Sequence, residues 1–175
     1  MEYLTLNNGN KMPMAGIGVF LLKPEETELS VLSALADGIR LIDTANAYRN
    51  EKAVGRAMKK SGVAREDIFL VTKLWPTVYT NENAVDETLA RLGTDYVDLL
   101  FLHQPAGDWR TGYKMMEKAY KEGKAKSIGI SNFEGKYIAE LETKWEIAPQ
   151  FIQVEAHPYF TQNELRKRST NTISS

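Results

Sequence analysis

The sequence of 175 residues contains no cysteine and only two histidines. Without cysteine there is no disulfide, no thiolate nucleophile and no Cys-ligated zinc or iron–sulfur centre. Long hydrophobic runs are also lacking, since none approaches the ~20 residues that span a bilayer. The opening Met1-Glu2-Tyr3-Leu4 has no basic-then-apolar pattern of a signal peptide. The sequence therefore predicts a cytoplasmic protein with no membrane partner.

Neither sign of charge dominates, because 22 Lys and Arg stand against 23 Asp and Glu. A chain with a net charge of −1 has no electrostatic footprint for nucleic acid. The short basic run Arg166-Lys167-Arg168 indicates only a solvated helix face. A hydrophobic content of 43% is ordinary for one soluble domain with a sizeable core.

Strand-like apolar segments recur at intervals close to 30 residues, which is the size of a βα unit. Their centres lie near Ile17, Ile42, Leu70, Leu100, Ile130 and Val154. Residue types that begin and end helices stand between them and predict helices over 24–37, 50–61, 82–92, 113–122 and from 161 onward. Ahead of the repeat, residues 3–13 carry Asn8-Gly9 and predict a hairpin.

The strands at 68–71 and 99–102 are continuously apolar, which is typical of parallel strands buried on both faces. Two α/β folds use such units, a doubly wound open sheet and a TIM-type barrel. Gly16-Ile17-Gly18 is only half of a dinucleotide fingerprint and lies inside a strand. We therefore predict a TIM (β/α)8-type barrel with an N-terminal hairpin, of which about six βα units are present.

Ionisable side chains follow three consecutive predicted strands. Asp43 ends the second strand and Tyr48 comes one turn later, while Lys73 and His103 end the third and fourth strands. The carboxyl ends of parallel strands share one face, so these four side chains can converge. Any one of these residues alone would more often be a cap, a packing residue or a solvated side chain. A purely structural role is much less expected for all four together than for any one of them.

These four residues form a complete set for reducing a carbonyl or oxidising an alcohol. Tyr48 would supply the proton that the oxygen requires. We expect the cation of Lys73 to lower the tyrosine pKa, and Asp43 to pair with the buried lysine. His103 would donate a hydrogen bond that orients and polarises the carbonyl.

The motifs that contain these residues resemble those of the aldo-keto reductase family, over about residues 3–166. The matching segments are Gly38 to Tyr48 with Asn50-Glu51, Val71 to Trp75, Asp95 to Pro105, Gly123 to Phe133 and Gln153 to Tyr159. The resemblance implies a (β/α)8 barrel that transfers a hydride between NADPH (NADP+) and a small-molecule carbonyl or alcohol substrate, without a metal. It also implies that Asp43, Tyr48, Lys73 and His103 are catalytic.

The same resemblance implies binding roles for further residues. Ser131, Asn132 and Gln153, with Asp43, would contact the cofactor at its nicotinamide end. Phe20, Trp75 and Trp109 would form an apolar substrate wall beside His103. The basic loop that binds the 2′-phosphate in the family has no counterpart in the sequence.

A complete eight-stranded barrel needs ~200 residues or more, whereas this sequence supplies six strands. We expect a partial barrel over residues 1–168 and an irregular tail over 169–175. The absent strands would leave open barrel edges that favour self-association. We therefore expect a reductase impaired in this form. The alternatives are a non-catalytic binding or regulatory derivative and an inactive fragment of the same fold.

Overall fold

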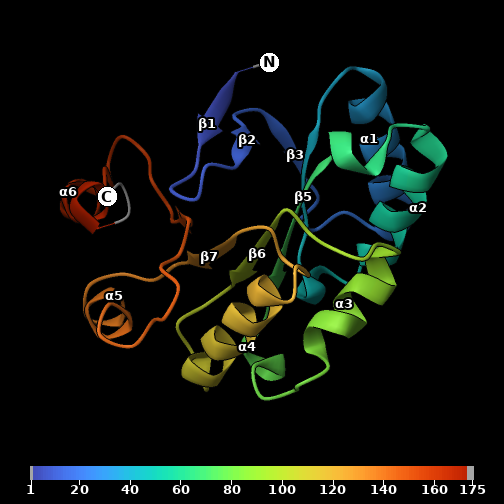
Figure 1. The fold of residues 1–175 in the computed structure, drawn as a ribbon. Coiled ribbons are helices and arrows are strands. Elements are labelled where there is room, and N and C mark those ends of the chain that lie inside the picture. Colours follow the sequence, from blue (N-terminus) through green and yellow to red (C-terminus); the bar gives the residue numbers. More distant parts are fainter. Residues whose placement is uncertain (1, 173–175) are drawn as a thin grey trace.

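The computed structural model describes residues 2–172. Its main body is a sheet of six parallel strands that pair in chain order, with helices connecting them (Figure 1). The strands are β3 (Gly16–Gly18), β4 (Leu41–Asp43), β5 (Phe69–Leu74), β6 (Leu99–Leu102), β7 (Ile128–Ser131) and β8 (Phe151–Gln153). The helices are α1 (Pro24–Ala36), α2 (Glu51–Ser61), α3 (Ala84–Leu92), α4 (Trp109–Lys121), α5 (Lys136–Leu141) and α6 (Asn163–Thr172). The six predicted βα units are confirmed.

The predicted hairpin is also present and closes one end of the sheet. Strands β1 (Tyr3–Thr5) and β2 (Lys11–Pro13) pair antiparallel, and Gly9 takes a φ of +86° in the turn between them. Leu6 and Met12 from this hairpin pack against apolar side chains on the inner face of the sheet. The hairpin thus covers apolar surface at the amino ends of the strands.

The two faces of the sheet meet different parts of the chain. Leu70, Leu100 and Ile130 belong to the core shared with the helices, whereas Val71 and Phe101 belong to a second cluster with the hairpin. Figure 1 shows helices α1 to α4 in an arc around the strands. A doubly wound sheet carries helices on both faces and reverses its strand order. Sequential order with helices on one face is instead the wall of a barrel, so the barrel prediction is confirmed.

Alternation along each strand determines which residues face the interior. In β5, Phe69 and Val71 point inward, so Lys73 two residues later does as well. The register pairs Asp43 with Val71, and Lys73 with Phe101. Neighbouring strands are therefore staggered, as barrel closure requires. This stagger brings the inward positions at the carboxyl ends of β4, β5 and β6 together.

The structure differs from the predicted boundaries in three places. Helix α4 begins at Trp109 rather than at residue 113, because the Asp108 carboxylate accepts a hydrogen bond from the Thr111 amide and caps an earlier turn. β8 ends at Gln153, just before its predicted centre. The irregular tail is wrong for residues 169–172, which continue α6. Ser, Thr and Asn each cost only about half a kcal/mol in a helix interior, so they do not end a helix already formed. Residues 173–175 lie outside the described part.

Strands β3 and β8 are the two edges of the sheet, since each pairs on one side only. Self-association through these edges stays a prediction. Between residues 2 and 172, no helix has both the length and the apolar composition needed to cross a membrane.

Close packing of α2 on α3 positions the start of α2 beside the carboxyl end of β4. A Cβ built on Gly55, within α2, would overlap the Leu92 carbonyl at the end of α3. Gly→Ala in a free helix stabilises by about 1 kcal/mol. Here we expect Gly55→Ala to destabilise by about 1–3 kcal/mol instead, because backbone atoms must move. Thermal or urea unfolding followed by circular dichroism measures the change.

Gly18→Ala is the matched control, because a Cβ at Gly18 meets no atom within 4 Å and its φ is not positive. A Gly55→Ala variant as stable as Gly18→Ala would contradict this account of the α2–α3 contact.

Candidate active site

Four ionisable side chains meet at the carboxyl end of the sheet, as the sequence predicts. Asp43 is the last residue of β4, Lys73 lies in β5, and His103 directly follows β6. Tyr48 ends a short 3-10 helix, η1 (Asn46–Tyr48), that follows β4.

Lys73 is the most deeply buried of the four, with 2% of its surface exposed. Its Nζ forms an ion pair with Oδ1 of Asp43 and lies 3.4 Å from the Thr44 carbonyl oxygen. Burial lowers the pKa of the Lys73 ammonium, and the Asp43 carboxylate opposes that shift. The predicted pairing of this lysine with this aspartate is therefore present in the structure.

The Tyr48 phenol lies beside this ion pair. Lys73 Nζ is 5.7 Å from the centroid of the Tyr48 ring. Burial and the nearby Asp43 carboxylate raise the pKa of Tyr48 to about 12. The expectation that Lys73 lowers this pKa is therefore wrong for this structure, because burial and the Asp43 carboxylate both disfavour a phenolate.

His103 is held between aromatic rings. Its ring centroid lies 5.7 Å from that of Tyr48 and 4.9 Å from that of Trp75, both edge to face. Burial and the positive charge of Lys73 lower the pKa of His103 to about 4. The imidazole is therefore neutral near pH 7, and one ring nitrogen carries a proton. Among the described residues, its Nδ1 is a buried atom without a hydrogen-bond partner.

Two of the three predicted wall aromatics border the four residues. Phe20 is 62% exposed and its ring centroid lies 4.8 Å from that of Tyr48. Trp75 is half-exposed, and its backbone N–H donates to Asn46 Oδ1 at 2.9 Å. The anchoring role of Asn46 was missed by sequence reasoning, although an asparagine at the start of a turn is a usable signal.

Trp109 does not join this wall. It is 3% exposed and packs against Phe133 in the core, with ring centroids 5.4 Å apart. The reason is the early start of α4, which makes Trp109 the first residue of a helix packed on the sheet. The prediction of a substrate-contacting role for Trp109 has no support in this geometry.

The polar residues predicted for cofactor binding follow β7 and end β8. The Asn132 amide nitrogen Nδ2 donates to the His103 carbonyl at 3.0 Å and to Ser131 Oγ at 3.1 Å. Its backbone N–H donates to the Gln153 carbonyl at 2.9 Å, and its φ is +61°. Asn132 thus connects the ends of three strands, while the Gln153 side chain is exposed and makes no hydrogen bond within residues 2–172.

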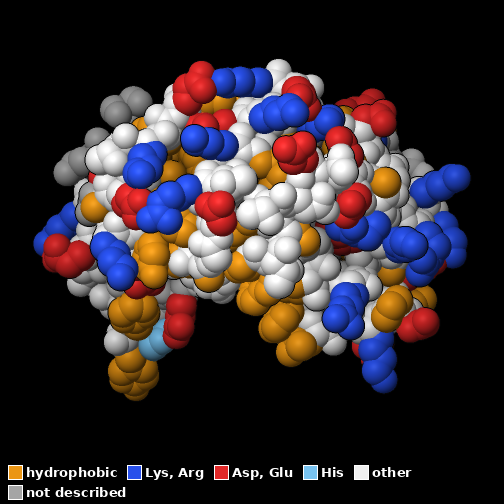
Figure 2. All heavy atoms as spheres, turned by 90° about the horizontal axis from the view of Figure 1, so that it is seen from below, with side chains coloured by type: hydrophobic (Ala, Val, Ile, Leu, Met, Phe, Trp, Pro, Cys, Tyr) orange, Lys and Arg blue, Asp and Glu red, His pale blue; other side chains and the backbone are white. Residues whose placement is uncertain are grey.

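A hollow of about 380 Å³ opens on the inner face of the sheet beside these groups. Asp43, Phe101 and Gln153 line it, as do Gly16 and Gly18 of the edge strand β3. Exposed hydrophobic side chains follow the carboxyl ends of β3, β5 and β8, and they include Phe20, Leu21, Trp75, Tyr159 and Phe160. Figure 2 shows hydrophobic side chains projecting in two groups along one edge of the molecule, with a recess between them.

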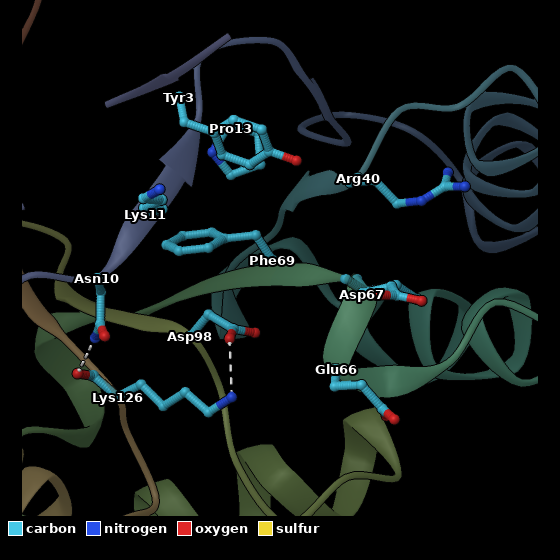
Figure 3. Close-up of a pocket in the computed structure, with 11 residues that line it drawn as sticks. Tyr3, Asn10, Lys11, Pro13, Arg40, Glu66, Asp67, Phe69, Asp98 and Lys126 are labelled. Carbon is cyan, nitrogen blue, oxygen red and sulfur yellow. Dashed lines mark hydrogen bonds and ion pairs between the residues drawn. The ribbon is translucent and has the colours of Figure 1, made fainter. Parts of the chain in front are cut away.

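A second hollow, of about 300 Å³, lies at the amino ends of the strands and is drawn in Figure 3. Two of its charges pair, since Lys126 Nζ lies 3.5 Å from Asp98 Oδ1, and Asn10 Nδ2 donates to the Lys126 carbonyl at 2.8 Å. None of the four ionisable residues lines this hollow. The hollow on the inner face, whose lining includes Asp43 and Gln153, is therefore the candidate active site.

The fold and the site define a singly wound βα barrel with its chemistry at the carboxyl ends of its strands. The model of the aldo/keto reductase family matches residues 19–172. Morphine 6-dehydrogenase of Pseudomonas putida is 45% identical over 168 residues, which are 93% of this chain and 57% of that protein. The chain therefore belongs to the aldo/keto reductase family.

Solved structures agree with this assignment. An aldo/keto reductase from Brucella melitensis is 40% identical and has a TM-score of 0.93, covering 98% of this chain and 70% of that one. An aldo-keto reductase of Bombyx mori in complex with NADP is 32% identical, with a TM-score of 0.91 over 98% of this chain and 64% of that one. The chain spans 57% of the length of the Pseudomonas relative.

The neutral state of His103 generates a pH prediction. Its folded-state pKa of about 4 lies below the ordinary value of 6.5. The contribution of this ring to the free energy of unfolding is therefore fully present above pH 6.5. It is lost as the pH falls through 4, because the unfolded chain binds the proton more readily than the folded chain does. NMR of a His157→Gln variant, which keeps a single histidine, follows the titration of His103 directly. A midpoint near 6.5 would show that the ring is solvated.

Proposed function

We propose that this chain is an NADPH-dependent oxidoreductase that reduces small aldehydes or ketones, or oxidises the corresponding alcohols. The observation that carries the proposal is the buried Lys73–Asp43 ion pair beside a protonated Tyr48 and a neutral His103. All four side chains lie at one end of the sheet, beside a hollow that Asp43 lines.

Tyr48 is the proposed proton donor. With a pKa of about 12 its hydroxyl keeps its proton at any ordinary working pH, so it is ready to protonate the oxygen of a reduced carbonyl. The phenolate left behind would lie near the Lys73 ammonium, which is fixed by Asp43 and cannot move to solvent. The same high pKa leaves little phenolate near pH 7, which is the form that would accept the proton when an alcohol is oxidised.

His103 is the proposed orienting group. A neutral imidazole has one N–H, which can donate to the carbonyl oxygen that Tyr48 protonates. The edge-to-face contacts with Tyr48 and Trp75 restrict rotation of the ring. A cationic imidazole would compete with Tyr48 as the acid, and the low pKa of His103 prevents this near pH 7.

Ser131, Asn132 and Gln153 would hold the carboxamide end of a nicotinamide, with Asp43 close by. The unpaired Gln153 side chain fits this role, because a free amide can both donate to and accept from a carboxamide. When bound, the reduced nicotinamide supplies the hydride. The Bombyx mori structure in complex with NADP supports NADPH as the donor.

The exposed rings of Phe20 and Trp75 favour substrates with an apolar or aromatic group beside the carbonyl. They contact Tyr48 and His103 respectively, so such a group would lie next to the reacting oxygen. The name of the Pseudomonas relative, a morphine 6-dehydrogenase, supports a bulky cyclic substrate in that protein.

Tyr48→Phe removes the hydroxyl group that is the proposed proton donor and keeps the aromatic ring. We expect kcat for an aromatic aldehyde to fall by about 10²–10⁴, because proton transfer contributes that much. The dissociation constant for NADP+, measured by quenching of tryptophan fluorescence, should change less than about twofold, since no nucleotide contact is removed. Tyr159→Phe, at a residue 97% exposed, is the control. Undiminished turnover in Tyr48→Phe would refute the proposal.

Gln153→Ala tests the cofactor site without turnover. We expect NADP+ to bind about tenfold more weakly to this variant, because one or two hydrogen bonds to the carboxamide are lost. Gln162→Ala, which removes a half-buried amide in the loop after β8 that bonds to Glu134 and the Glu155 carbonyl, serves as control. A wild-type chain that neither binds NADP+ nor turns over an aldehyde would contradict the whole proposal.

A further inference from the structure

The segment Val19–Leu22, which follows β3, has a strained backbone. Leu21 takes a φ of +63°, in the left-handed region that branched apolar residues rarely occupy. Leu21 is also 82% exposed, so burial does not stabilise this conformation. Strain of this kind persists only where surrounding contacts hold the backbone in place.

Two backbone bonds hold this segment, since the Val19 N–H donates to the Asp43 carbonyl at 3.1 Å and the Leu22 N–H donates to the Val19 carbonyl at 3.3 Å. One buried side chain, Asn50, adds contacts at both ends of the segment. Its Nδ2 donates to the Val19 carbonyl at 2.8 Å, and lies 3.2 Å from Thr27 Oγ1 and 3.4 Å from the Leu22 carbonyl. Val19 and Leu22 flank the strained residue on both sides. Asn50 is 1% exposed, so water does not compete for these bonds.

The other end of the Asn50 amide reaches the four ionisable residues. Its Oδ1 accepts a hydrogen bond from Thr44 Oγ1 at 2.8 Å. Thr44 is fully buried, follows Asp43, and presents its carbonyl to Lys73 Nζ at 3.4 Å. One amide therefore connects the segment that carries Phe20 to the backbone beside the ion pair.

Helix capping does not explain an asparagine at this position. Asn50 is the N-cap of α2, where an asparagine oxygen usually accepts from the first helical N–H groups. Here the side chain makes no such bond, because Oδ1 is occupied by Thr44. The sequence predicts Asn50 as a helix start, and the structure assigns its side chain to other contacts.

We propose that Asn50 is a positioning residue, which holds the strained segment Val19–Leu22 so that Phe20 stands against Tyr48 as one wall of the substrate site. The consequence of this positioning rests on the proposed function, because the wall would select carbonyl substrates with an aromatic or apolar group. The positioning itself can be tested without any turnover.

The test is chymotryptic cleavage of the native chain after Phe20, measured relative to cleavage after Tyr159. Both sites are exposed aromatics, and Tyr159 lies in a loop that Asn50 does not touch. We expect Asn50→Ala to raise the Phe20 to Tyr159 ratio about tenfold or more, because loss of the buried bonds frees the segment.

Gln150→Ala is the matched control, since Gln150 is also a buried amide and is 6% exposed. Its side chain accepts from the Ile128 amide and donates to the Ala148 carbonyl, away from Val19–Leu22. We expect its ratio to stay within about threefold of wild type. An equal rise in both variants would mean general loosening and would overturn the proposal, as would no rise in Asn50→Ala.

Substitutions at Leu21 separate strain from side-chain loss. Glycine adopts a positive φ freely, whereas alanine keeps the Cβ that causes the strain. We expect the effect of Asn50→Ala on the ratio to shrink to about threefold or less in a Leu21→Gly background. In a Leu21→Ala background it should persist. Equal effects in the two backgrounds would contradict the proposal that Asn50 holds a strained segment in place.

The functional consequence has its own measurement. In the aldehyde assay we expect Asn50→Ala to raise KM for an aromatic aldehyde about fivefold or more with kcat changed less than about twofold, since a binding wall is lost and the proton donor is not. A matched fall in kcat would overturn the positioning role. Failure of the proposed reduction would abolish turnover in the wild type as well, and would leave the cleavage ratios unaffected.

Discussion

The buried ion pair between Lys73 and Asp43 is the constraint on which the rest of the site depends. A lysine that is 2% exposed is costly unless a carboxylate meets it, and breaking such a pair typically costs about 3–5 kcal/mol. The pair spans β4 and β5, so it forms only if the strands keep their register. The register pairs Asp43 with Val71, one pleat before Lys73. The alternation of side chains along each strand and the stagger between strands therefore together bring Lys73 to Asp43, and the chemistry of the site depends on both.

Small residues on the inner face make this geometry feasible. A Cβ on Gly129 would lie 2.5 Å from a ring atom of Phe101, so the glycine in β7 gives space to the aromatic ring in β6. Phe101 packs with Val71 and the hairpin residue Met12 in an apolar cluster that also lines the hollow on this face. The polar residues thus lie next to an apolar layer, and Lys73 itself is only 2% exposed.

Burial then sets the protonation states. Partial burial raises the pKa of Tyr48 to about 12 and lowers that of His103 to about 4. Both shifts favour the neutral form, so the two groups that would face a carbonyl oxygen are hydrogen-bond donors without net charge. The aromatic rings of Phe20 and Trp75 contribute to this environment, and Asn50 and Asn46 hold the segments that carry them. The two asparagines thus position the aromatic rings, and burial beside those rings sets the pKa values of Tyr48 and His103.

The sequence by itself determined the βα repeat, the inward positions of Asp43, Lys73 and His103, and their chemistry, because hydrophobic periodicity and strand ends are local properties. Only the tertiary structure decided the rest. The pKa of Tyr48 rises because burial and the Asp43 carboxylate disfavour the phenolate, and both depend on how the chain segments pack. Trp109 entered the core because Asp108 caps α4 one turn earlier than predicted. Asn50 bonds three chain segments that are up to 31 residues away in sequence. Pattern within one segment cannot reveal such contacts, since they exist only after the segments have packed.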